Sequence, residues 1–275
     1  MSDTTTTGRY ADVNGLHLYY ETHGTGRPLI LLHGGLGAGG MFGPILPALT
    51  ERHQVILPDL QGHGRTADID RPIDIALMAD DIAALIDHLG LDRPDVAGYS
   101  LGGGVALLTA IRHPEKVGRL VSASAHIRTD ALPAEMREQQ GQVNAAAAEF
   151  LKETPMYQTY MELAPRPEDF PRLLDKMGEA MSHDFDYTEE VRGLQMPTLI
   201  VAGDADMAPP SHYVEVFKLL DGGLRDGGWM SEGRPKGGHA LAILPGLTHY
   251  NLFASPLFAA VTLAFLDPEE TSWVG

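Results

Sequence analysis

Short apolar runs recur along the chain and alternate with stretches in which apolar residues return at helical spacing. Runs of this kind, without polar alternation, are typical of strands that are buried on both faces of a parallel sheet. One helical stretch ends near Leu89 and is followed by Gly90, which suits a left-handed helix terminus. The runs predict strands at residues 28–32, 54–57, 95–98, 119–123, 197–203 and 240–244, with helices near 78–89, 211–220 and 257–266.

The N-terminal part shows a different pattern. Residues 10–13 and 16–21 flank Asn14-Gly15, a pair that favours a tight hairpin turn. We therefore expect an antiparallel hairpin, followed by strands that alternate with helices. This order predicts an α/β fold with a doubly wound, mostly parallel sheet.

The middle of the chain, residues 130–192, breaks the alternation. It has few strand-like runs and is rich in alanine, methionine and charged residues, with prolines at 155, 165, 167 and 171. We expect several short helices interrupted at these prolines. The organisation predicted is a core domain made of residues 1–129 and 193–275, with residues 130–192 inserted as a helical cap over the carboxyl edge of the sheet.

Composition and charge narrow the classes of partner. The 275 residues are 44% apolar and 21% charged, with a formal net charge of -17 and no cysteine. The charge argues against nucleic acid and anionic membranes as partners and favours a neutral or apolar small molecule. The absence of cysteine excludes disulfides, thiolate metal sites and a cysteine nucleophile.

The polar N-terminal residues lack the pattern of a signal peptide, and no apolar stretch approaches the length of a membrane span. A cytoplasmic location is therefore expected. The oligomeric state is left open, with a homodimer as one option.

One motif suggests chemistry: Gly98-Tyr99-Ser100-Leu101-Gly102. It follows a predicted strand and precedes a helix predicted by the spacing of Val105, Leu108 and Ile111. A serine at the tip of so sharp a turn needs neighbours without a Cβ, because the strand and helix backbones nearly touch there. The motif predicts Ser100 as a nucleophile, provided that a base, an acid and an oxyanion hole exist elsewhere. The alternative is a glycine-rich loop with no catalytic role.

Twelve histidines compete for the role of base. His249 is the candidate, because it follows the final predicted strand on a loop from which its imidazole can reach Ser100. His126 and His183 lie at the edge of the helical middle or within it, where contact with a substrate is a lesser option for each. The others fit packing, capping or surface roles better, and His33 is expected to hold its own loop by hydrogen bonds to the backbone.

The acid is expected after the strand that precedes the base, where Gly203-Asp204-Ala205-Asp206 stands. Spacing alone does not choose between Asp204 and Asp206, and either could instead cap a helix or a turn. The oxyanion hole needs two backbone N–H groups. We predict those of Leu101 and Gly35, with Leu36 as the next choice for the second donor.

These features together resemble the α/β-hydrolase fold family over nearly the whole chain. The matching residues are His33-Gly34-Gly35, Asp59 with Gly62-x-Gly64, the serine motif, Gly203-Asp204-Ala205-Asp206 with Pro209, and Pro245-Gly246-x-x-His249. The resemblance places the acid at Asp206. It is strongest to small capped bacterial esterases, enol-lactonases, C–C bond hydrolases and cofactor-free haloperoxidases. The loop at 221–238 is a departure, expected to decorate the surface.

The function expected is that of a carboxylesterase-type serine hydrolase, which cleaves esters of small, largely apolar substrates through an acyl-enzyme and needs no cofactor or metal. Two alternatives stay open. The same triad could act on a lactone or a C–C bond, because substrate choice depends on the cap. The protein could also be a ligand sensor without turnover.

Overall fold

A single mixed sheet forms the centre of the molecule. The computed structural model of the chain describes residues 8–229 and 237–267, and within these the sheet has the order β1-β2-β4-β3-β5-β6-β7-β8. Strands β3 to β8 run parallel, while β1 and β2 pair antiparallel as the predicted hairpin. The strands are β1 Arg9–Val13, β2 Leu16–His23, β3 Arg27–Leu32, β4 His53–Pro58, β5 Asp95–Tyr99, β6 Leu120–Ala123, β7 Thr198–Ala205 and β8 Ala240–Thr248.

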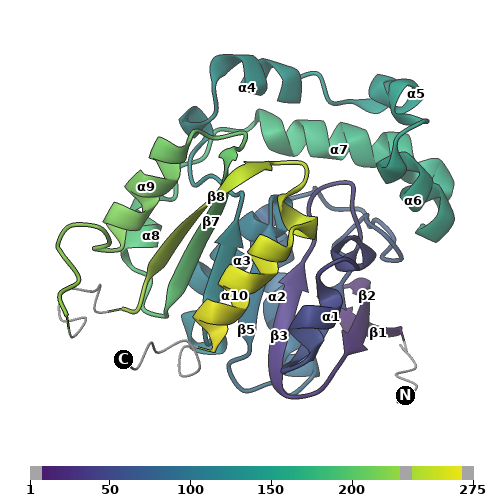
Figure 1. Cartoon of the computed structure of the whole chain (residues 1–275). Coiled ribbons are helices and arrows are strands. Elements are labelled where there is room, and N and C mark those ends of the chain that lie inside the picture. The colour runs from purple at the N-terminus through teal and green to yellow at the C-terminus, as the bar shows by residue number, and fades with distance from the viewer. Residues whose placement is uncertain (1–7, 230–236, 268–275) are drawn as a thin grey trace.

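Helices cover both faces of this sheet, as the apolar strand runs require (Figure 1). Helices α2, α3, α8 and α9 bury apolar side chains against one face, and α1 and α10 do so against the other. The helices are α1 Leu46–Thr50, α2 Ile75–His88, α3 Leu101–Arg112, α8 Thr188–Arg192, α9 Pro210–Leu219 and α10 Pro256–Leu266. The predicted α/β fold with a doubly wound, mostly parallel sheet is confirmed.

Strand β8 differs from its prediction because it continues past Leu244 to Thr248. Pro245 lies inside it, although proline cannot donate to a strand ladder. The position is tolerated because β8 is the edge strand and pairs only with β7. His249 therefore follows the strand directly instead of lying some way along a loop.

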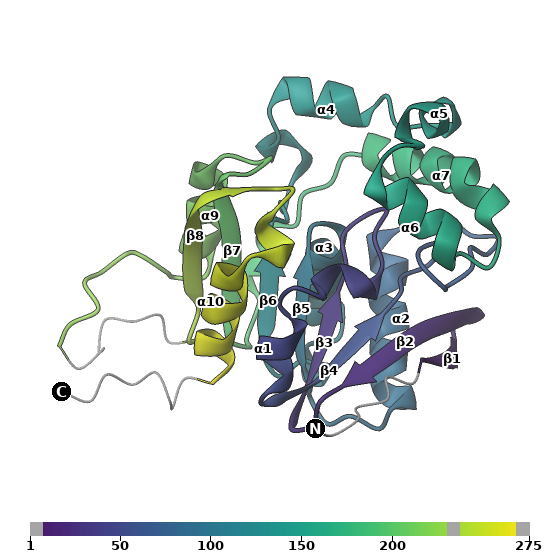
Figure 2. The same cartoon turned by 45° about the vertical axis from the view of Figure 1, so that its right-hand side comes forward.

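Four further helices come from the middle of the chain and lie above the sheet edge, as Figures 1 and 2 show. They are α4 Ala134–Gln140, α5 Ala148–Leu151, α6 Pro155–Leu163 and α7 Phe170–Ser182. The predicted breaks between short helices fall at the prolines, and Pro165 and Pro167 lie between α6 and α7. Pro155 and Pro171 stand at the first or second position of α6 and α7, where a helix has no use for the missing N–H group.

Two segments that the sequence analysis discussed lie partly or wholly outside the described residues. The N-terminal residues 1–7 and residues 230–236 of the long glycine-rich loop are not among those described. In the described part of the chain, no helix combines the length and the apolar character that crossing a membrane demands.

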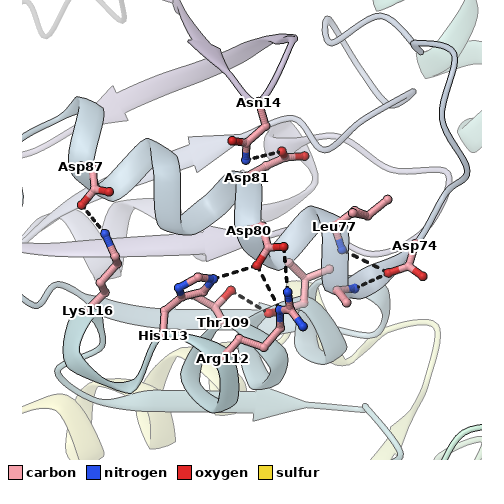
Figure 3. A network of polar contacts seen from close by, with 12 residues as sticks. Asn14, Asp74, Leu77, Asp80, Asp81, Asp87, Thr109, Arg112, His113 and Lys116 are labelled. Carbon is pink, nitrogen blue, oxygen red and sulfur yellow. Dashed lines mark hydrogen bonds and ion pairs between the residues drawn. The ribbon is translucent and has the colours of Figure 1, made fainter.

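Helices α2 and α3 are joined by a polar network, drawn in Figure 3. Asp80 on α2 accepts two hydrogen bonds from the Arg112 guanidinium, at 3.0 and 2.9 Å, and lies 2.8 Å from His113 Nε2. The Arg112 hydrogen bonds hold the pKa of Asp80 below its ordinary value, with His113 contributing. Asp74 begins α2 by accepting the N–H groups of Ala76 and Leu77.

We predict that Asp80→Asn lowers the free energy of unfolding at neutral pH by about 1 kcal/mol or less, because the cluster is partly exposed. A carboxylate whose pKa is depressed by folding stabilises the protein above its unfolded pKa, and this contribution disappears as the pH falls through the acid range. Urea unfolding of wild type, Asp80→Asn, Arg112→Gln and the double variant at pH 7 and pH 3 measures it. Equal losses at both pH values, or no coupling between the two substitutions, would contradict the prediction.

Candidate active site

Ser100 stands at the turn between β5 and α3, in backbone geometry that few residues adopt. Its φ is 56° and its ψ is -119°. The turn is possible because Gly98 and Gly102 have no Cβ: one added to Gly98 would lie 2.0 Å from the Gly102 carbonyl oxygen, and one added to Gly102 would lie 2.3 Å from that of Leu32. The strain fixes the hydroxyl at the carboxyl edge of the sheet.

His249 reaches Ser100 from the end of β8. Its Nε2 lies 2.9 Å from the Ser100 hydroxyl oxygen. Tyr99, the neighbour of Ser100, supports this placement: its hydroxyl donates to the backbone carbonyl of His249, and the two rings lie 5.3 Å apart. The residue before the serine therefore anchors the segment that carries the imidazole.

Asp206 follows β7 and is hydrogen-bonded to His249 on the side away from Ser100. Its Oδ1 accepts a hydrogen bond from His249 Nδ1 at 2.8 Å, which leaves Nε2 free to accept from Ser100. Asp204 takes the other role that the sequence left open, because its Oδ1 accepts the backbone N–H of Gly246 at 2.9 Å. The geometry thus brings Asp206, and not Asp204, to the imidazole.

The surroundings of Asp206 keep it ionised. Its side chain is fully buried, and burial alone would raise its pKa. Hydrogen bonds from His249 and Ser124 outweigh this effect, so the pKa of Asp206 lies below its ordinary value. The Ser124 hydroxyl donates to Oδ2 at 2.6 Å.

The glycine loop after β3 lies against the serine. A Cβ on Gly34 would lie 3.4 Å from Ser100 Cβ, and one on Gly35 would lie 4.0 Å from Leu101 Cβ. In the described part of the chain the N–H groups of Gly35 and Leu101 donate to no other residue. The oxyanion hole predicted from these two N–H groups stays a prediction, and their lack of another acceptor is compatible with it.

His33 holds this loop from below. It is fully buried, accepts the Leu60 N–H at 2.9 Å through Nε2 and lies 2.8 Å from the Gly34 carbonyl oxygen through Nδ1. Burial lowers the pKa of His33 to about 4, so it stays neutral and acts as a structural bridge.

The Gly62-x-Gly64 segment also has a structural explanation. Asp59 accepts the N–H groups of Gly39 and Arg65, each at 2.8 Å. A Cβ on Gly64 would lie 2.2 Å from Asp59 Oδ2, so only glycine fits this turn, where φ is +50°. The segment thus ties the loop after β4 to the loop after β3.

Three residues near the site were not singled out from the sequence: Ser124, Tyr99 and Met177. Ser124 directly follows β6, so its position at the same sheet edge was the available signal. Tyr99 lies inside the serine motif, but nothing in the sequence reveals its partner. Met177 of α7 would lie 3.1 Å from a Cβ on Gly35, a contact that only tertiary structure defines.

His126 lies close to these groups without joining them. Its ring packs at 5.4 Å against that of Phe185, and burial lowers the pKa of His126 to about 4. Among the residues that the structure describes, no three His, Asp or Glu side chains gather in a way that could hold a metal ion.

A family model described as alpha/beta hydrolase fold matches residues 27–223, which is more than half of the chain. The chain belongs to the α/β-hydrolase fold family. The matched region includes the strained serine turn and Asp206, while His249 lies beyond it in sequence and is brought back by β8.

Relatives within the family carry several hydrolase names. A protein of Azorhizobium caulinodans named as the carbamate hydrolase RutD is 29% identical over 236 residues, which cover 79% of this chain and 86% of that protein. The enol-lactonase from Burkholderia xenovorans LB400 has 22% identity and a TM-score of 0.69, covering 94% of this chain and 99% of its own. The carboxylesterase CesB from Bacillus subtilis has 18% identity and a TM-score of 0.73, with 97% and 93% covered. At these identities the two structures show a shared fold.

The geometry predicts a definite tautomer for His249, in which Nδ1 carries the proton and donates a hydrogen bond to Asp206. Nitrogen NMR of histidine-labelled protein should show this tautomer near neutral pH in the wild type and in Asp204→Asn, and its loss in Asp206→Ala. Asp204→Asn is the matched control because it changes a carboxylate two residues away that contacts Gly246 instead. An unchanged His249 signal in Asp206→Ala would contradict the arrangement.

Proposed function

We propose that the protein is a serine hydrolase that cleaves carboxylic ester bonds of small, largely apolar substrates through an acyl-enzyme. One observation carries the proposal: the Ser100 hydroxyl, on a strained turn, lies 2.9 Å from an imidazole whose other nitrogen is bound to a buried, ionised carboxylate. This is the arrangement that turns a serine hydroxyl into a nucleophile near neutral pH.

The first half-reaction forms the acyl-enzyme. Ser100 Oγ attacks the ester carbonyl carbon while His249 Nε2 takes its proton. The carbonyl oxygen becomes an oxyanion, which accepts hydrogen bonds from the N–H groups of Gly35 and Leu101. The tetrahedral intermediate then expels the alcohol, which receives the proton from His249, and Asp206 stabilises the imidazolium in between.

Water completes the cycle. His249 takes a proton from a water molecule as its oxygen attacks the acyl carbon, and the same two N–H groups bind the second oxyanion. Collapse of this intermediate returns the proton to Ser100 Oγ and releases the carboxylic acid.

The preference for apolar substrates rests on what surrounds the oxyanion groups. The Met177 methyl group of α7 lies over Gly35, and Leu36 and Leu101 belong to the same apolar cluster. A flexible thioether and two leucines favour a neutral acyl group over a charged one. We infer that residues 130–192 act as a cap and supply the acyl pocket through α7.

A covalent probe tests the nucleophile. A fluorophosphonate should label the wild type and Ser122→Ala, and should not label Ser100→Ala, because among the serines that the structure describes Ser100 alone has an imidazole within hydrogen-bond reach. Ser122 is the matched control, since its buried hydroxyl donates to the Gly103 carbonyl instead. Labelling of Ser100→Ala at the wild-type rate would overturn the assignment.

A substrate panel tests the bond that is cleaved. With p-nitrophenyl esters, an aryl carbamate, an enol-lactone and a vinylogous 1,5-diketone, we expect the highest kcat/KM on short neutral esters. A kcat/KM on the carbamate or the lactone that is higher than on every ester would show that the protein cleaves that bond instead, with the same triad. Turnover below about one per minute on all of them, far under the range of ordinary enzymes, would favour a ligand sensor.

A further inference from the structure

Ser124 occupies a strained position beside the acid. It follows β6 directly, has a φ of +52° and is only 3% exposed. A positive φ is uncommon for any residue except glycine, and the surrounding structure must impose it. The proton transfers of the mechanism derived above do not pass through its hydroxyl, which contacts Asp206 and neither Ser100 nor the imidazole.

Two hydrogen bonds fix this residue. Its N–H donates to the Val201 carbonyl of β7 at 2.8 Å, at the point where the pairing of β6 with β7 ends. Its hydroxyl then donates to Asp206 Oδ2 at 2.6 Å. The backbone bond thus sets the direction from which the hydroxyl reaches the carboxylate.

The carboxylate divides its hydrogen bonds between its two oxygens. Oδ1 accepts from His249 at 2.8 Å and from the Met207 N–H at 2.8 Å. Oδ2 accepts from Ser124 and, at a longer 3.2 Å, from the Gly203 N–H. Among the described residues Ser124 is therefore the one side chain that holds the oxygen facing away from His249.

We propose that Ser124 is a positioning residue that acts through Asp206, orienting the carboxylate toward His249. The catalytic consequence of this role rests on the proposed hydrolase function. The orientation of Asp206 by Ser124 can be tested without catalytic activity. A short bond from a hydroxyl to a carboxylate is of the stronger, charge-assisted kind.

Other titratable groups face Asp206 from the elements packed around it: His249 after β8, His126 after β6, Tyr99 on β5 and Tyr213 on α9. Burial lowers the pKa of His126 to about 4 and raises the pKa of both tyrosines, so these three stay neutral near pH 7. Within the described residues, His249 is thus the neighbour whose charge changes during the reaction.

Two kinds of variant separate the hydroxyl from the strained backbone. Ser124→Gly relieves the strain but removes the hydroxyl. Ser124→Thr keeps the hydroxyl but places a β-branched residue at positive φ, where it is disfavoured. Ser122→Ala is the control, because it removes a buried hydroxyl from the same strand without touching Asp206.

The test measures kcat/KM for p-nitrophenyl acetate against pH in all four proteins. We expect Ser124→Gly to lose about tenfold to a hundredfold in kcat/KM, since hydrogen bonds to charged groups are the stronger ones. Without the hydroxyl the carboxylate is a more basic acceptor, so the Asp206–His249 pair keeps its proton to higher pH. The acid limb, which is the low-pH side of the kcat/KM profile where activity rises, should therefore move to higher pH by about half a unit or more.

Ser124→Thr should keep the wild-type acid limb even if it unfolds at lower temperature, and Ser122→Ala should match the wild type. A Ser124→Gly profile with an unmoved acid limb, whether or not the rate falls, would overturn the positioning role.

Failure of the proposed function is distinguishable from failure of this inference. If the wild type neither reacts with a fluorophosphonate nor hydrolyses any ester, the hydrolase proposal fails. The positioning role is then decided by nitrogen NMR of His249: Ser124→Gly should lose the defined Nδ1-protonated signal, and Ser124→Thr should keep it. An unchanged signal in Ser124→Gly would overturn it.

Discussion

The site depends on the near contact between two backbones at Ser100. Strand β5 must turn into α3 within one residue, and the Gly98 and Gly102 backbones approach so closely that a Cβ on either would overlap a carbonyl group. Strain of this kind costs about 1–3 kcal/mol, which the packed sheet and helices around it must offset. As a result, Ser100, the first turn of α3 and the glycine loop after β3 lie close together.

Asp206 and His249 come together because of the parallel arrangement of the strands. Parallel strands end at one edge, so the residues after β5, β7 and β8 come together although they are far apart in sequence. Burial of Asp206 is unfavourable by itself, and the hydrogen bonds from His249, Ser124 and Met207 outweigh it together with the charge of His249. The same contacts that make the carboxylate stable in the fold also aim it at His249.

The helices above the sheet edge contact the loops around Ser100. Helix α7 packs Met177 against the oxyanion loop and Leu173 near Gly62, so it touches the loops after β3 and β4. In the proposed hydrolase, the triad would determine which bonds are attacked, and this apolar surface of α7 would determine which molecules reach them. A change on α7 is therefore expected to alter substrate preference before it alters the chemistry.

The sequence by itself determined the sheet and the chain order of serine, aspartate and histidine after its strands, because apolar runs, glycine turns and residues after strands are local signals. It did not extend β8 past Pro245, since only the sheet order makes that an edge strand. Nor did it choose Asp206 over Asp204 by spacing, or reveal Ser124 and Tyr99 as partners of the triad. Those depend on distances between segments brought together by folding, and such distances are set by packing.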